Sequence, residues 1–219
     1  MMVKKRLKSL IRNNSGATVI EFAMVTVPMM GMILSSLDLA HGYYVNSLIQ
    51  GAVDKGGRDS SLQNKAGYAS QADYDAAIDA IVKAAVLPAV PFATGTCAPA
   101  SGQTAAVTSN CMSFARKSFY TFANISRSEQ FTDTNHNGVR NTGECYVDDD
   151  ADRQWDAATG NTGQGGANSI VVYTVTINYD HIFPVASFFG APKSRQTIAQ
   201  TILRNQPYAT SSAPSVICT

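Results

Sequence analysis

Charged side chains are scarce in this 219-residue chain, where Asp, Glu, Lys and Arg together make up 15% and the formal net charge is +1. The sequence contains no G-x-S-x-G, H-E-x-x-H, P-loop or G-x-G-x-x-G pattern, which argues against the common hydrolases and nucleotide-binding enzymes. Five of the 17 basic residues lie in residues 1–16, so the other 12 face 16 acids and leave a charge of −4 elsewhere. That balance does not suggest a basic face for nucleic acid.

One long apolar run is present, from Ala17 to Leu37, and it contains a single ionisable residue, Glu21. At about 1.5 Å per residue, a helix of this length spans roughly 30 Å, the thickness of the hydrocarbon core of a bilayer. A carboxylate inside such a segment costs roughly 2.5–3.5 kcal/mol on insertion scales, which makes Glu21 a functional candidate. The residues before the run include five Lys and Arg and no acid, so we expect this end in the cytoplasm and the rest exported.

Three interpretations of this segment compete. A cleaved secretory signal would need a shorter apolar core followed by a small-x-small site, and residues 38–42 fit that poorly. A plain signal anchor accounts for the apolar length and the basic flank but leaves Glu21 unexplained. In the third interpretation, cleavage after Gly16 makes Ala17 a new N-terminus. Its ammonium group then pairs with Glu21 of a neighbouring subunit when the helices pack, which cancels two buried-charge penalties.

The residues around this point follow a recognisable pattern. Gly16 is followed by Ala-Thr-Val-Ile-Glu-Phe-Ala, and then come Val27-Pro28, Leu37-Asp38 and Tyr43-Tyr44. This pattern resembles the type IV prepilin signature and, more narrowly, the TadE-like pseudopilins of tight-adherence (Tad, or Flp) pilus systems. The resemblance covers residues 15–55 and returns weakly at residues 201–208. One mild departure is Phe22, because the major pilins of such systems have Tyr after the Glu.

The resemblance implies a processing site and a set of partners. It implies cleavage between Gly16 and Ala17 by a membrane prepilin peptidase, and assembly through the helix that carries Glu21 and Phe22. The expected partners are other pilins or pseudopilins, the pilus assembly platform and the inner membrane. We expect a single-pass inner-membrane protein of a bacterium, with a cytoplasmic N-terminus and a periplasmic C-terminal domain. After assembly it would reach the pilus or the cell surface.

The four cysteines all lie in the part expected to be exported. No C-x-x-C pair occurs among them, which weakens a zinc or thioredoxin-like interpretation, and an even count in an oxidising compartment favours two disulfides. Three connectivities are possible, and the sequence alone does not decide among them. We favour Cys97–Cys111, which closes a short loop of small residues, and Cys145–Cys218, which would hold the chain end beside an acidic loop.

The predicted fold class is α+β, a long pilin-like N-terminal transmembrane helix followed by a small exported domain with a helix and an antiparallel sheet. We divide the chain into a basic leader at 1–16, the apolar helix and its periplasmic extension at 17–56, and an exported domain at 57–219. The exported domain includes an acidic loop region at 133–159.

Local patterns predict the elements of these parts. Gly56-Gly57 is expected to end the first helix, and apolar spacing predicts a second helix over 71–87. Runs rich in aromatic and β-branched residues predict strands, the last antiparallel to the one before it. The predicted strands cover Met112–Ile125, Ser169–Tyr179 and Gln196–Arg204, with a flexible loop at 157–168.

The stretch from Asp133 to Glu144 matches the twelve-residue calcium loop D-x-[DN]-x-[DN]-G-x5-E at every constrained position. Side-chain oxygens at positions 1, 3 and 5 converge on one hard cation, and Gly138 permits the sharp turn. A backbone carbonyl at position 7, a side chain or water at position 9 and a bidentate Glu at position 12 complete the shell. The predicted ligands are Asp133, Asn135, Asn137, Val139, Asn141 and Glu144.

The calcium pattern partly repeats fifteen residues later, where Phe131-Thr132-Asp133 aligns with Tyr146-Val147-Asp148. The second copy keeps the spacing of oxygen ligands, but Arg153 replaces the turn glycine and Thr159 stands where Glu is expected. Its predicted ligands are Asp148, Asp150, Asp152 and Asp156, and these acids repel one another unless a cation or an Arg neutralises them.

Calcium binding competes with a polar surface loop that matches by chance, and the adjacent partial copy favours calcium. The flanks do not resemble the long helices of an EF-hand, and the loops look more like those of dockerins or thrombospondin repeats. Such extracellular modules bind calcium at roughly 10⁻⁴–10⁻³ M, which favours a structural role over signalling.

These patterns predict a minor pseudopilin of a Tad-type pilus, cleaved after Gly16 and carrying a Ca²⁺-stabilised exported domain. That domain would cap or prime the filament or take part in cell adhesion. The alternative is an uncleaved membrane-anchored calcium-binding or adhesion module outside any pilus. A periplasmic hydrolase is a further alternative and would need a nucleophile and a base brought together in the folded domain. We expect no enzymatic activity, no nucleic acid and no small-molecule substrate.

Overall fold

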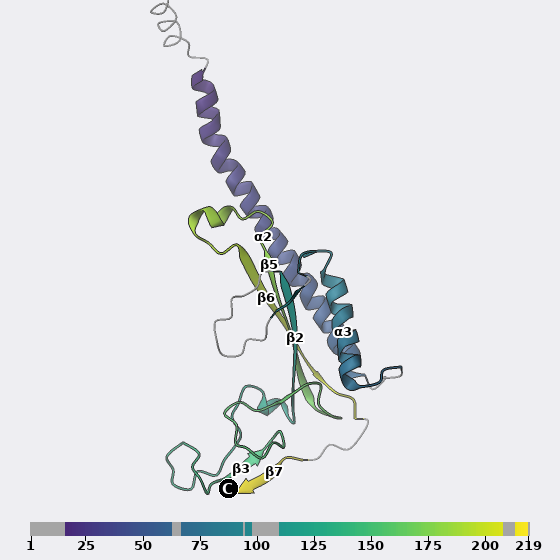
Figure 1. The fold of residues 1–219 in the computed structure, drawn as a ribbon. Coiled ribbons are helices and arrows are strands. Elements are labelled where there is room, and N and C mark those ends of the chain that lie inside the picture. Colours follow the sequence, from purple (N-terminus) through teal and green to yellow (C-terminus); the bar gives the residue numbers. More distant parts are fainter. Residues whose placement is uncertain (1–15, 63–66, 94, 98–109, 208–212, 219) are drawn as a thin grey trace, which may run out of the picture. The chain divides into compact units, whose positions relative to one another are not determined.

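The computed structural model describes residues 16–62, 67–93, 95–97, 110–207 and 213–218 (Figure 1). The predicted leader, apart from Gly16, and the loop at 98–109 lie outside the described residues. A long apolar helix followed by a second helix and antiparallel-rich sheets confirms the predicted α+β class. The elements are α2 (Ala17–Ser61), α3 (Gln71–Val86), β1 (Gly95–Thr96), β2 (Cys111–Phe119), η2 (Phe122–Asn124), β3 (Cys145–Asp148), β4 (Asn161–Thr162), β5 (Ile170–Asp180), η3 (Val185–Phe189), β6 (Ser194–Arg204) and β7 (Ser215–Cys218).

The described residues form two compact units. The first unit runs up to Tyr43 and includes Asp180–Arg195, and the second contains the rest of the chain. In the first unit, Asp38 of α2 anchors the segment that follows β5. Its carboxylate accepts a hydrogen bond from the backbone N–H of Ile182 at 3.0 Å and lies 2.5 Å from Nδ1 of His181. The short helix η3 lies in the same segment.

The second unit is built on a sheet with the strand order β1-β2-β5-β6, in which β4 also pairs with β2. Strand β5 confirms the predicted strand at 169–179, and β2 runs antiparallel to it. The prediction that the earlier strand reaches Ile125 is wrong. Phe119 pairs with Ile170, where β5 begins, so the chain beyond Phe119 has no strand to pair with there and forms η2 instead. The loop predicted at 157–168 contains β4, which pairs with Lys117 and Ser118.

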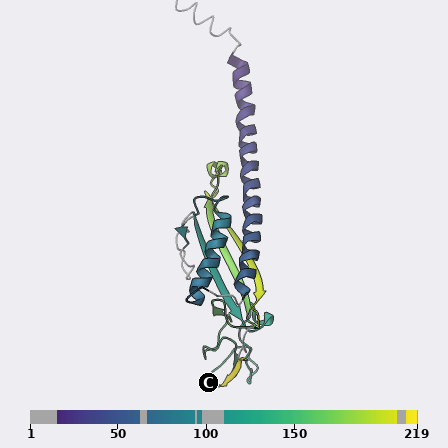
Figure 2. The same ribbon diagram turned by 90° about the vertical axis from the view of Figure 1, so that its right-hand side faces the viewer.

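The core of the second unit lies between the sheet and its two helices, which Figure 2 shows side by side along the strands. Alternate residues of β5 face this core, as the two-residue period of a strand requires. Each fully buried aliphatic side chain contributes about 1.5–3 kcal/mol relative to exposure. The central members are Val45, Ile49 and Val53 of α2, Val82 and Val86 of α3, and Tyr173, Val175 and Ile177 of β5.

The two glycines expected to end the first helix lie inside it, because α2 continues to Ser61. A Cβ atom on Gly56 would lie 2.6 Å from Val82 Cγ2, and one on Gly57 would lie 2.6 Å from Thr201 Cγ2. The pair therefore serves close packing against α3 and β6. The prediction that these glycines end the helix is therefore wrong, because they are needed for close packing and not for a helix end.

A buried ion pair joins α3 to the sheet. Nη2 of Arg116 on β2 lies 2.6 Å from Oδ1 of Asp79 on α3, and the Tyr173 hydroxyl donates to the same oxygen at 2.7 Å. Burial and the neighbouring Asp79 raise the pKa of Tyr173 well above its ordinary value, so this hydroxyl stays a donor. These charge-assisted bonds hold α3 in one position along the strands.

A second, two-stranded sheet pairs β3 with β7 in antiparallel register, from Cys145 opposite Cys218 to Asp148 opposite Ser215. Both predicted disulfides, Cys97–Cys111 and Cys145–Cys218, are present. The prediction that the strand ending at Arg204 is the last one is wrong, since β7 follows it. This short strand exists because it pairs with β3, which lies far away in the sequence. A pairing between such distant segments could not be inferred from the local sequence pattern.

Candidate functional sites

The N-terminal part of α2 is apolar on all sides. Gly16 is exposed immediately before the helix, Ala17 begins it, and Glu21 and Phe22 project from its first turns, with 72% of Phe22 accessible. An 18-residue window of this helix has none of its residues buried and is long and apolar enough to cross a membrane. A helix that is hydrophobic all round belongs in lipid or inside a larger assembly. Among the described residues, α2 is thus a candidate membrane span.

The first predicted calcium loop folds around Asp133. Its Oδ1 accepts the backbone N–H of Asn137 at 3.1 Å, and its Oδ2 accepts that of Gly138 at 2.7 Å. Asn135 and Asn137 each accept a backbone N–H two residues further on, at 3.1 and 2.8 Å. The side chains predicted at positions 1, 3 and 5 therefore shape the loop, and most of this loop is exposed.

Glu144 closes the first loop from its last position. One carboxylate oxygen accepts the backbone N–H of Thr134 and the other accepts that of Asn141, both at 2.9 Å. The N–H of Asn141, with that of Thr134, lowers the pKa of Glu144 below its ordinary value, because both bonds favour the charged form. The Val139 carbonyl accepts the Asn141 side-chain amide at 2.7 Å. In this arrangement the first loop holds itself together.

The second loop repeats three of these side-chain contacts at equivalent positions. Asp148 Oδ2 accepts the backbone N–H of Arg153 at 3.1 Å, as Asp133 does for the residue five positions on. Asp150 accepts the N–H of Asp152 at 3.3 Å, and Asp152 accepts that of Gln154 at 2.6 Å. The second loop therefore repeats most of these contacts. The bond that Asn137 makes to Asp133 Oδ1 has no counterpart, because Asp148 Oδ1 lacks a hydrogen-bond donor.

The turn at Arg153 forms without a glycine. Gly138 has φ +75° and Arg153, its counterpart, has φ +64°, while His136 and Ala151 at position 4 have φ +57° and +65°. The left-handed turn that Gly138 makes in the first loop is therefore made by Arg153 in the second. The left-handed conformation costs a non-glycine residue roughly 1–2 kcal/mol, which the surrounding hydrogen bonds offset.

Glu129, which sequence analysis missed, closes the second loop in place of the absent position-12 glutamate. Its Oε1 accepts the backbone N–H of Asp149 at 2.8 Å and its Oε2 accepts that of Asp156 at 3.0 Å. These are positions 2 and 9 of the second loop, the same positions that Glu144 holds in the first. Thr159, at position 12, instead donates its hydroxyl to the Asn124 carbonyl at 2.5 Å.

A sequence signal for Glu129 does exist. Glu129 precedes Asp133 by four residues, and Glu144 precedes Asp148 by four residues, so the fifteen-residue repeat extends further upstream than the alignment at Phe131. The calcium-loop pattern places Glu144 at the end of the first loop. It does not show that Glu144 also stands at the start of the second repeat, where it is equivalent to Glu129.

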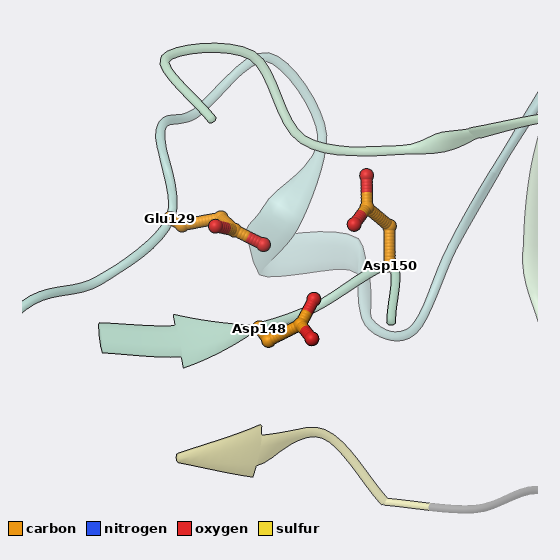
Figure 3. A group of neighbouring side chains, drawn as sticks. All are labelled: Glu129, Asp148 and Asp150. Atoms are coloured by element: carbon orange, nitrogen blue, oxygen red, sulfur yellow. The ribbon is translucent and has the colours of Figure 1, made fainter. Parts of the chain in front are cut away.

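The second loop collects carboxylates that can hold a metal ion. Ligand atoms of Glu129, Asp148 and Asp150 lie within 4.8 Å of one another, as do those of Asp150, Asp152 and Asp156. Figure 3 shows the first three carboxyl groups turned toward one another beside the end of β3. Oxygen-only donor sets of this kind suit hard cations such as Ca²⁺ or Mg²⁺.

The environment of this group disfavours negative charge. Burial raises the pKa of Glu129 above its ordinary value, and Asp150 and Asp148 add to the rise, while the N–H groups of Asp149 and Asp156 offset it in part. Burial also raises the pKa of Asp150, with a further contribution from its acidic neighbours. Both directions follow from like charges gathered in a partly dehydrated place.

Fold and sites together define a class of protein that has an apolar N-terminal helix long enough to cross a membrane, an α+β domain and two successive acidic loops. Residues 16–58 match the family model for TadE-like protein. This match confirms the resemblance found at residues 15–55. No curated protein and no solved structure gave a match to the chain.

Proposed function

We propose that this chain is a minor pseudopilin, a membrane-anchored structural component of a Tad-type pilus. The observation that carries the proposal is the match of residues 16–58 to the TadE-like family. The large hydrophobic side chains that α2 leaves exposed along this region support it, because assembly through a shared apolar helix needs such a surface. The role is structural and assembly-related, with no enzymatic step.

In this proposal a prepilin peptidase cuts the chain after Gly16 in the inner membrane, with the leader on the cytoplasmic side. The new ammonium group of Ala17 on one subunit then pairs with Glu21 of its neighbour. Pairing removes two uncompensated charges from an apolar bundle, so it favours assembled over isolated helices. The partners are other pilins or pseudopilins and the assembly platform.

The exported domain in this proposal is stabilised by Ca²⁺ at the tandem loops. Support comes from the repeated loop backbone, in which Asp133 and Asp148 hold the same position. Millimolar Ca²⁺ would occupy about half or more of sites with dissociation constants of roughly 10⁻⁴–10⁻³ M. The alternative function, an uncleaved anchored calcium-binding or adhesion module, shares this domain and differs only in processing and assembly.

Processing is tested by intact mass and N-terminal sequencing of the protein from native membranes, with and without the prepilin peptidase. The informative variant is Gly16→Val, and its matched control is Gly31→Val in the same helix. Apart from chain neighbours and the backbone of the same helix, no described atom lies within 4 Å of a new Cβ at either position. We expect a mature chain starting at Ala17 in the control and a longer, unassembled form for Gly16→Val. An intact leader in every strain would establish the anchored module instead.

Assembly is tested with Glu21→Gln, which keeps the size of the side chain and removes its charge. Breaking one partner of a buried ion pair costs about 3–5 kcal/mol, enough to remove the variant from assembled pili while processing continues. Ser36→Ala is the control, since the Ser36 hydroxyl bonds only to the Ile33 carbonyl of its own helix. Normal pilus incorporation of Glu21→Gln would refute the charge-pairing mechanism.

A further inference from the structure

The two acidic repeats face each other around a local two-fold relation. Phe131 and Tyr146, which are equivalent in the fifteen-residue repeat, form an antiparallel bridge. The backbone N–H of Thr132 donates to the Cys145 carbonyl at 2.7 Å, and that of Val147 donates to the Gln130 carbonyl at 2.8 Å. The two bonds are equivalent, because Thr132 and Val147 occupy the same position in the two repeats, and so do Gln130 and Cys145. The pairing therefore places the start of each repeat beside the loop of the other.

Because of this two-fold relation, the glutamate that begins each repeat closes the loop of the other repeat. Glu144 begins the second repeat and bonds to positions 2 and 9 of the first loop. Glu129 begins the first repeat and bonds to the same positions of the second loop. The absent Glu at position 159 is thus replaced by a residue from the opposite repeat, and the ligand set of the second loop gains a third carboxylate beside Asp148 and Asp150.

One buried oxygen in this group lacks a partner. Asp148 is 2% exposed and Glu129 is 1% exposed. Oδ2 of Asp148 accepts the N–H of Arg153, but Oδ1 is buried with no hydrogen-bond donor, and Figure 3 shows this carboxyl group facing Glu129 and Asp150. In the described part of the chain, no salt bridge reaches these three acids. A buried carboxylate oxygen without a donor, among other carboxylates, is the arrangement that a cation satisfies.

We infer that Glu129, Asp148 and Asp150 form a calcium site of the second loop, completed by the exchanged glutamate of the opposite repeat. Asp152 and Asp156 extend the same oxygen-only ligand set through Asp150. The site deepens the proposed calcium stabilisation of the exported domain and is independent of pilus assembly. Ca²⁺ fits better than Mg²⁺ because it accepts many carboxylates in irregular geometry, whereas Mg²⁺ demands a near-ideal octahedron and retains water.

Tb³⁺, a luminescent substitute for Ca²⁺, can report on this site separately. Trp155 is the only tryptophan of the chain, and its indole N–H donates to the Glu129 carbonyl at 3.1 Å. Excitation of Trp155 therefore sensitises Tb³⁺ bound in the second loop. The experiment uses the full chain in detergent after chelator treatment, with Ca²⁺ titrated in parallel by calorimetry.

The decisive variant is Asp150→Asn. Its Oδ1 can still accept the N–H of Asp152, so the loop backbone keeps its hydrogen bond while the site loses one charge. We expect Trp-sensitised Tb³⁺ affinity to fall about tenfold or more, the size that losses around metal ligands commonly have. Glu129→Gln should do the same. Asp149→Asn is the matched control, because it removes an adjacent charge outside both ligand groups and should leave the signal unchanged.

Glu144→Gln separates this inference from the proposed calcium binding as a whole. It should weaken calorimetric Ca²⁺ binding at the first loop and leave the Trp155 signal in place. Wild-type affinity and stoichiometry in both Asp150→Asn and Glu129→Gln would overturn the inference while calcium binding at the first loop stands. If the wild-type chain binds no Ca²⁺ at all, both proposals fail. Should Glu129→Gln not fold, Asp150→Asn alone decides.

Discussion

The two acidic loops share one backbone and differ in electrostatics. Glu144 and Glu129 each accept two backbone N–H groups at the same loop positions, yet the pKa of Glu144 is lowered and that of Glu129 is raised. The first loop has neutral asparagines at positions 3 and 5, and its two carboxylates are the half-buried Asp133 and the buried Glu144. The second gathers the buried Glu129 and Asp148 beside the half-buried Asp150. A repeated geometry therefore does not imply a repeated affinity, because local dielectric and neighbouring charge decide what the same hydrogen bonds are worth.

The largest expected effect concerns the Cys145–Cys218 disulfide, which lies between the two loops, directly after Glu144 and three residues before Asp148. Replacing Cys145 and Cys218 by Ala should lower the free energy of unfolding by about 2–4 kcal/mol. The control is the same change at Cys97 and Cys111, which are 14 residues apart compared with 73 for the other pair. On the chain-entropy model its loss should be smaller by roughly 1.5 kcal/mol. Denaturant unfolding measures both, and equal losses would contradict the model.

Removing calcium should loosen the second loop more than the first. A ligand at 100 times its dissociation constant stabilises the folded state by about 2.7 kcal/mol. Trypsin provides a matched pair of probes, since Arg153 lies in the second loop and Arg140 in the first. We expect a chelator to accelerate cleavage after Arg153 more than after Arg140, as followed by mass spectrometry. Equal acceleration at both sites would show that calcium stabilises the two loops to the same extent.

Substituting the first acid of each loop should have effects of opposite sign without calcium. Asp148→Asn keeps the bond to the Arg153 N–H and turns an amide toward Glu129, so we expect it to stabilise the calcium-free protein by about 1 kcal/mol. Asp133→Asn should destabilise by about 1 kcal/mol, because both Asp133 oxygens accept backbone N–H groups. Melting temperatures in chelator measure the pair, and a shared sign would show that the two environments do not differ.

The smallest expected effect concerns the turn position. Gly138→Ala introduces a Cβ into open space at φ +75°, so its cost of about 1 kcal/mol is conformational alone. Arg153→Gly relieves the same strain at φ +64° and should stabilise by about 0.5 kcal/mol after the entropy of the new glycine is subtracted. Chemical denaturation at saturating calcium tests both, and a destabilising Arg153→Gly would mean that the arginine side chain contributes its own contacts.

Local chemistry was sufficient for several features of this protein. The apolar run after Gly16 predicts a helix because every residue from Ala17 to Leu37 except one is compatible with lipid, and β-branched residues predict β5. The spacing of Asp133, Asn135 and Asn137 predicts a loop in which side-chain oxygens organise neighbouring backbone N–H groups. These features depend on contacts within a few residues, which a sequence pattern contains.

Other features were decided only by the tertiary structure. Helix α2 runs through Gly56 because α3 needs close approach there, and β7 exists because β3 offers it an edge. Glu129 enters the second loop through an antiparallel pairing of two repeats, so its role depends on the spatial exchange of two similar segments. Sequence by itself determined where oxygen ligands could gather. The fold decided which glutamate joins which loop, because hydrogen-bonded pairing between distant segments is set by packing in space and leaves no local trace.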